Sequence, residues 1–135
     1  MDKSDFATAI NCIDGRVQAP VSNWIEEHFD VRYVDMITEP GAVRVMALGP
    51  LGTMRSIKQK TIVSVKGHHS SLIAVVGHHD CLAIPIPQEE HLDYIRQSVE
   101  RVVSWGLSVR VVGLWVNERG EIETICDTGR SDSTG

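Results

Sequence analysis

The stretch SLIAVVGHHDC, residues 71–81, decides the fold. Its first part, residues 71–77, is an apolar and largely branched run, which is typical of a strand buried on both faces of a parallel sheet. Two histidines, an aspartate and a cysteine follow it directly, as HHDC at residues 78–81. The stretch therefore predicts a central strand whose carboxyl end carries side chains able to bind a metal or take part in catalysis.

On both sides of this strand, short apolar runs alternate with segments of helical period. Further strands are predicted at residues 6–13, 31–37 and 107–116. Helices are predicted at residues 19–29, 53–66 and 87–106, where apolar residues recur at helical spacing. The segment VRVMAL, residues 43–48, is expected to be extended or irregular. This alternation indicates an α/β domain built on a mainly parallel sheet.

The carboxyl-terminal part of the chain predicts a closing hairpin. Turn-forming residues at 117–120 separate the last parallel strand from EIETI, residues 121–125, which we expect to form an antiparallel edge strand. The predicted sheet thus has four parallel strands and one antiparallel edge strand, with helices on both faces. With 135 residues and 42% hydrophobic content, the chain predicts a single domain at residues 1–126 and a polar, flexible tail at residues 127–135.

Composition narrows the classes of partner. A net charge of −5 argues against the basic surface that binds nucleic acid or anionic lipid, so neither a nucleic-acid nor a membrane partner is expected. The chain starts without a secretory signal and has no run of ~20 apolar residues, which predicts a cytoplasmic protein. Cys12, Cys81 and Cys126 are too few for a disulfide framework, so metal binding or nucleophilic chemistry is the expected use of any functional cysteine.

Two predicted strands deliver metal-binding side chains. Cys12 ends the first strand, in INCIDGRV at residues 10–17, while His78 and Cys81 follow the central strand. Because parallel strands bring their carboxyl ends to one edge of the sheet, we expect these three residues to converge. Two thiolates and an imidazole are a common zinc set, and three protein ligands with an open fourth position indicate a catalytic site. A closed, structural site would need a fourth ligand, for which the spacing leaves four candidates open: His79, Asp14, His68 and His69.

Asp14 and Arg16 alternate with Cys12, so in an extended segment all three side chains point the same way. The carboxylate could accept a hydrogen bond from zinc-bound water or displace that water as fourth ligand. The arginine would keep the carboxylate ionised and decide which of these states prevails. His91, near the start of the last helix, is expected to be solvated.

The motifs CIDGR, residues 12–16, and HHDC, residues 78–81, resemble the C-x-D-x-R and H-x-x-C motifs of the β-class carbonic anhydrases. They occur in the same order and at the expected strand ends, and the resemblance extends over nearly the whole chain. It implies the fold of that family, with Zn2+ held by Cys12, His78 and Cys81. It also implies that Asp14 orients or replaces the catalytic water and that Arg16 pairs with Asp14.

The activity implied by this resemblance is the reversible hydration of carbon dioxide to bicarbonate and a proton through zinc-bound hydroxide, in a homodimer or higher homo-oligomer. The chain departs from the family at Leu82, where the family has glycine, and at residues 38–41, where it has an Arg-Asn-Ala-Gly-like stretch. These departures leave open a zinc hydrolase of carbonyl sulfide or carbon disulfide. Two further alternatives are a non-catalytic zinc-binding module closed by Asp14 and a metal-free thiol protein.

Overall fold

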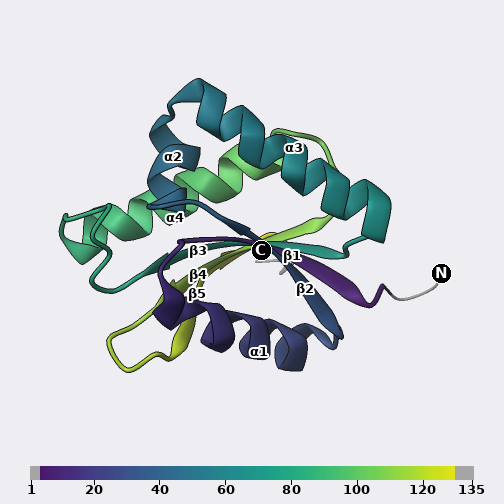
Figure 1. Ribbon diagram of the computed structural model, residues 1–135, viewed down its shortest axis with the longest axis horizontal. Coiled ribbons are helices and arrows are strands. Elements are labelled where there is room, and N and C mark those ends of the chain that lie inside the picture. Colours follow the sequence, from purple (N-terminus) through teal and green to yellow (C-terminus); the bar gives the residue numbers. More distant parts are fainter. Residues whose placement is uncertain (1–3, 130–135) are drawn as a thin grey trace.

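A five-stranded sheet forms the centre of the computed structural model, which describes residues 4–129 (Figure 1). The strands are β1 (Phe6–Asn11), β2 (Tyr33–Thr38), β3 (Leu72–His78), β4 (Arg110–Val116) and β5 (Ile122–Asp127). Their order across the sheet is β2-β1-β3-β4-β5, with the first four parallel and β5 antiparallel to β4. This arrangement confirms the fold class predicted from the sequence.

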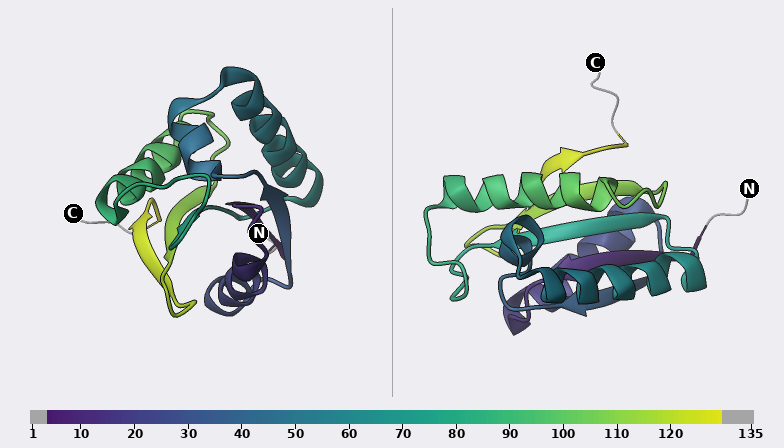
Figure 2. Two further views of the ribbon diagram at one scale, coloured as in Figure 1. Left: turned by 60° about the vertical axis from the view of Figure 1, so that its left-hand side comes forward. Right: turned by 90° about the horizontal axis from the view of Figure 1, so that it is seen from above.

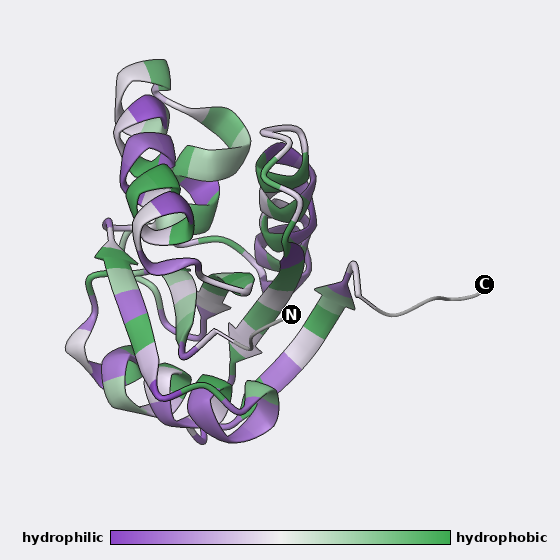
Figure 3. Ribbon diagram, turned by 90° about the vertical axis from the view of Figure 1, so that its right-hand side faces the viewer, coloured by the Kyte–Doolittle hydropathy of each residue, from purple (hydrophilic) through white to green (hydrophobic). Residues whose placement is uncertain are grey.

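Helices cover both faces of the sheet. They are α1 (Gln18–Phe29), α2 (Ala42–Leu48), α3 (Leu51–His68) and α4 (Gln88–Val103), and a short 3-10 helix, η1 (Gly15–Val17), precedes α1. Helix α1 lies on one face, and α2, α3 and α4 lie on the other (Figures 1 and 2). Figure 3 shows that the helices carry both hydrophobic and hydrophilic residues, as expected for helices that cover a sheet with one side and meet solvent with the other.

The core is built around β3, the central strand that was predicted from the apolar run at residues 71–77. All seven of its residues are buried, as are five of the six residues of β1 beside it. Both strands are covered by helices on both faces, which is why their sequences are largely apolar rather than alternating, with Thr8, Asn11 and His78 as buried polar exceptions. The carboxyl ends of these two neighbouring strands are the place where the candidate site forms.

The prediction for residues 43–48 was wrong, because these residues form helix α2. Seven residues make less than two turns, so the sequence shows no clear helical period, and a helix this short depends on packing for its stability. Val43 and Met46 are buried, and α2 packs against α4. The remaining predicted helices and strands occur in the structure with ends shifted by a few residues.

Helix α4 packs against the sheet over two glycines, Gly77 and Gly113. A Cβ added at Gly113 would lie 2.6 Å from Cγ2 of Ile95, and one added at Gly77 would lie 2.9 Å from Nε2 of His91. A side chain at either position would collide with α4, so glycine is needed for the helix to pack this closely on β3 and β4. The approach brings the first turn of α4 over the end of β3, beside the candidate site.

At the carboxyl end, β5 continues to Asp127, whose carboxylate accepts hydrogen bonds from Arg110 at 2.9 and 2.7 Å. Residues 130–135 of the predicted tail lie outside the described residues. The division into one domain at residues 1–126 and a tail at residues 127–135 therefore stays a prediction. None of the helices within residues 4–129 has both the length and the apolar character needed to cross a membrane.

Candidate metal centre

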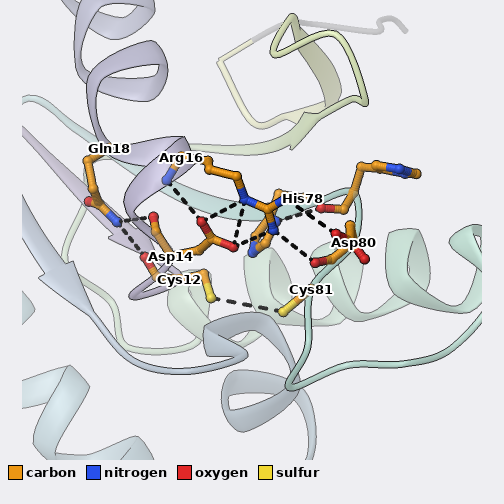
Figure 4. Close-up of polar contacts among 8 residues, drawn as sticks. Cys12, Asp14, Arg16, Gln18, His78, Asp80 and Cys81 are labelled. Carbon is orange, nitrogen blue, oxygen red and sulfur yellow. Dashed lines mark hydrogen bonds and ion pairs between the residues drawn. The ribbon is translucent and has the colours of Figure 1, made fainter.

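Cys12, His78 and Cys81 meet at the carboxyl ends of β1 and β3. One ligand atom from each residue lies within 4.8 Å of the other two, and all three side chains are buried. The sulfurs of Cys12 and Cys81 are 3.9 Å apart and are not joined by a disulfide (Figure 4). The convergence follows from the parallel pairing of β1 with β3, which brings their carboxyl ends to one edge of the sheet.

The imidazole of His78 is oriented by a backbone contact. Its Nδ1 lies 2.8 Å from the carbonyl oxygen of His79, so Nδ1–H donates to that oxygen and Nε2 carries the free lone pair. Nε2 is buried and has no hydrogen-bond partner among the described residues. Leaving a buried acceptor unsatisfied is unfavourable, whereas a ligating histidine whose other nitrogen donates to a carbonyl is the usual arrangement at a metal.

The contact between the two sulfurs shifts the pKa values of the two cysteines in opposite directions. The Cys81 thiol donates a hydrogen bond to the Cys12 thiolate and so lowers the pKa of Cys12 far below its ordinary value, with help from His78 and from the backbone N–H groups of Asp14 and Gly41. The same contact, together with burial, raises the pKa of Cys81. A divalent cation between the sulfurs would favour ionisation of both, because a coordinating thiol is deprotonated.

The charge of His78 follows that of Cys12. Burial alone would lower the pKa of His78, but the neighbouring Cys12 thiolate and the His79 carbonyl outweigh burial and raise it. The Cys12 thiolate and the His78 imidazole therefore each favour the charged form of the other. If a metal were bound, the same atoms would be its donors, since metal binding requires deprotonated ligands.

Asp14 lies beside this group with its carboxylate turned toward Arg16. Arg16 donates from Nε at 3.0 Å and from Nη2 at 2.7 Å, and its backbone N–H donates to the same carboxylate at 2.9 Å. These hydrogen bonds hold the pKa of Asp14 well below its usual range. Gln18 closes the turn by donating to the carbonyl oxygens of Cys12 at 2.7 Å and Asp14 at 2.8 Å. The carboxylate therefore stays ionised beside the three donor atoms.

The other candidates for a fourth ligand lie in different surroundings. His68 pairs with Asp35, with Nδ1 2.7 Å from Oδ2, and stacks on Phe6 with ring centroids 4.0 Å apart. His69 is exposed at the end of α3, and His79 lines a cavity next to the cluster. Within residues 4–129, the three-residue group is Cys12, His78 and Cys81, without a fourth histidine or acidic residue.

The cavity beside the group has a volume of about 480 Å³ and is bounded by the loop that follows β3, by Trp115 and by His91. The prediction that His91 is solvated was wrong, because His91 is only 3% exposed and lies edge-on to Trp115 at a centroid distance of 4.9 Å. Burial, with a smaller effect from His78, lowers the pKa of His91 to about 4. The helical period could have predicted that His91 is buried, since His91 lies one turn before Ile95 and two turns before Val99 on the buried face of α4.

The chain matches one protein family and is similar to several solved structures. Residues 2–126 match the family described as "Putative carbonic anhydrase". No curated protein sequence matches the chain. Among solved structures, the chain is similar to β-carbonic anhydrase isoform I from Trichomonas vaginalis, with 18% identity, a TM-score of 0.61 and coverage of 94% of this chain and 86% of that one.

Two further solved structures show the same likeness. One is the carbonic anhydrase from Streptococcus mutans, at 12% identity and a TM-score of 0.62, covering 93% of this chain and 87% of that one. The other is one of two tetrameric β-carbonic anhydrases from Sordaria macrospora, at 13% identity and a TM-score of 0.54, covering 96% and 84%. At these identities the likeness concerns the fold.

Proposed function

Because the chain belongs to the family described as "Putative carbonic anhydrase", we propose that it catalyses the reversible hydration of carbon dioxide to bicarbonate and a proton with the help of zinc. The observation that carries the proposal is the buried group of Cys12, His78 and Cys81, whose donor atoms lie within 4.8 Å of one another beside an ionised Asp14.

The residues present fit a zinc ion. Two sulfurs and one imidazole nitrogen are a preferred donor set, and the buried Nε2 of His78 lacks any other partner. Cys12, Cys81 and Nε2 of His78 would hold the ion, while Asp14 is engaged by Arg16 rather than turned to the group. When bound in such a set with one position open, zinc supplies Lewis acidity that lowers the pKa of water to about 7.

The protein's own groups prepare this position. Backbone N–H groups of Asp14 and Gly41 toward Cys12, and of Ala83 and Ile84 toward Cys81, spread the negative charge of the sulfurs. Asp14 is kept as an acceptor by Arg16, so it can orient a water molecule through a hydrogen bond without taking its proton permanently. The site therefore holds a water in place and keeps its acceptor in one protonation state across the neutral pH range.

We further propose a homodimer or higher homo-oligomer. Two apolar side chains next to the cysteines, Ile13 and Leu82, are 60% and 89% exposed. These exposed side chains, each adjacent in sequence to a cysteine of the group, favour a contact surface here, and a second copy of the chain would cover them and narrow the entrance to the group. The substrate that suits such an entrance is a small, linear and weakly polar molecule.

The direct test is stopped-flow hydration of carbon dioxide at pH near 8.5, on protein whose zinc content has been measured. We expect turnover in the wild type and a fall to the uncatalysed rate in Cys12→Ser, with Cys126→Ser as a matched control because Cys126 lies on β5, outside the group. No turnover from protein with one zinc per chain would refute the proposal.

A second candidate activity is hydrolysis of carbonyl sulfide or carbon disulfide at the same centre. The observation that favours it is Leu82, an exposed apolar side chain directly after a proposed ligand. Turnover with carbon dioxide, carbonyl sulfide and carbon disulfide, compared at equal zinc loading, separates the two activities. A closed, non-catalytic site would require Asp14 to leave Arg16 and would show full zinc occupancy without turnover on any of the three.

A further inference from the structure

Asp80 lies between the two proposed ligands His78 and Cys81 and has no part in the chemistry described above. Arg16 nevertheless reaches it with two hydrogen bonds, from Nη1 to Oδ2 at 3.3 Å and from Nη2 to the backbone oxygen at 3.2 Å. In Figure 4, Asp14, Arg16 and Asp80 form a row along the two sulfurs. Arg16 thus connects the segment after β1 to the segment after β3, across 64 residues of sequence.

We propose that Asp80 is a positioning residue that, through Arg16, holds Asp14 away from the metal and keeps the fourth position open to an incoming ligand. The inference rests on the proposed function, because it concerns the same metal centre. Asp80 is not one of the residues that the two motifs define, because it stands at a variable position of H-x-x-C.

The argument starts from the geometry of the guanidinium. Nε and Nη2 face Asp14, and Nη1 faces Asp80, so carboxylates on two sides fix the plane of the group. Arg16 is otherwise weakly held, since its side chain is 62% exposed. With Asp14 as its only carboxylate partner, Arg16 and Asp14 could move together. Asp80 ties the pair to the loop that carries His78 and Cys81.

The consequence of losing this tie follows from the position of Asp14. Its backbone N–H already contacts the sulfur of Cys12, so Asp14 lies next to the donor group. Carboxylate oxygen is an ordinary zinc ligand. A released Asp14 would therefore compete with any external ligand for the fourth position.

The test uses Asp80→Asn, which removes the charge and keeps the shape. Asp80 has φ of 58°, a conformation that asparagine tolerates well. The matched control is Asp93→Asn, since Asp93 forms a similar exposed pair with Arg96 at 2.8 Å on α4, and the two aspartates are 61% and 63% exposed. Both variants and the wild type are loaded with Co²⁺ and titrated with thiocyanate, and the visible spectrum reports binding.

We expect the Kd for thiocyanate to rise about two- to fivefold in Asp80→Asn, the effect typical of an exposed ion pair, and to stay unchanged in Asp93→Asn. Removing a negative charge near the metal would by itself tighten the binding of an anion, so the expected change has the opposite sign to a simple charge effect. Tighter or unchanged binding in Asp80→Asn would overturn the inference.

Two further measurements locate the effect. In the Asp14→Asn background, adding Asp80→Asn should no longer raise the Kd for thiocyanate, because the effect acts through Asp14; a persistent rise would contradict this. In metal-free protein, solvent exchange of the Arg16 Nε–H, followed by NMR, should be faster in Asp80→Asn than in Asp93→Asn. If Co²⁺ gives no sulfur-to-metal absorption at all, the metal centre itself is refuted, and the inference falls with it.

Discussion

At the scale of single residues, the site depends on neighbours that lie both far away and close by in the sequence. Cys81 and His78, which come from the other strand end, lower the pKa of Cys12, whereas Arg16, two residues along the chain, lowers the pKa of Asp14. The motifs C-x-D-x-R and H-x-x-C announce these residues in the sequence. His91 belongs to no motif, and its burial beside Trp115 depends on how α4 meets the sheet.

We predict that His91 makes the protein less stable in acid. Its pKa is about 4 when folded and about 6.5 when unfolded, so between these values the unfolded chain binds a proton that the folded chain does not. Stability should be complete above pH 7 and fall by about 2 kcal/mol between pH 7.5 and 5.0 through this residue alone. The free energy of unfolding, measured with urea at pH 7.5 and at pH 5.0, tests this prediction.

The variant His91→Leu should show a smaller loss of stability over the same pH interval than the wild type at equal metal content. His28→Leu, at an exposed position on α1, is the control and should keep the wild-type dependence. If His91→Leu and the wild type lost the same stability between pH 7.5 and pH 5.0, burial would not hinder protonation of His91 in the folded state.

At the scale of helices and strands, largely apolar runs predicted β1 and β3, because strands buried on both faces are dominated by hydrophobic residues. Helix α2 could not be predicted in the same way, since its seven residues are held by contacts with α4 rather than by their own helical tendency. The contact of Arg16 with Asp80 was not predicted either, because Asp80 occupies a variable position of the H-x-x-C motif, even though the parallel topology brings the two loops together.

The close approach of α4 to the sheet should be sensitive to a single methyl group. Gly113→Ala would place a Cβ 2.6 Å from Ile95 and 2.9 Å from the sulfur of Cys126, and we expect destabilisation of about 1–3 kcal/mol from overpacking. Gly67→Ala is the control. Gly67 lies in α3 with nothing within 4 Å, so alanine there should be neutral or stabilise by up to about 1 kcal/mol.

Chemical denaturation measures both variants. A Gly113→Ala protein as stable as wild type would show that α4 can move outward without loss, and that the glycines are not what determines its distance from the sheet.

At the scale of the whole molecule, the residues of the candidate site lie together at one edge of the sheet. The cysteines and His78 lie where β1 and β3 end, Arg16 links the two loops, and exposed apolar side chains flank the group. The motifs and the parallel topology were enough to predict which side chains meet. The proposed oligomer, by contrast, was predicted only from the family resemblance and the small size of the domain, because the exposure of side chains such as Leu82 is not visible in the sequence.

We predict that Leu82→Glu weakens self-association, because a charge in an apolar contact must be desolvated. Sedimentation analysis over a range of concentrations should show a lighter species than in the wild type. Val63→Glu on α3, at a position 70% exposed, is the control and should sediment as the wild type does. The same association in Leu82→Glu and wild type would place the subunit contact elsewhere.

The claim on which the account depends most is that a single zinc ion is bound by Cys12, His78 and Cys81. Zinc-edge X-ray absorption on the purified protein tests it directly. We predict one zinc per chain with two sulfurs at about 2.3 Å and lighter atoms at about 2.0–2.1 Å, one of them an imidazole nitrogen. The two-sulfur signal should be lost in Cys12→Ser. Absence of zinc, or a zinc shell without sulfur, would contradict the account and remove the basis for the proposed activity.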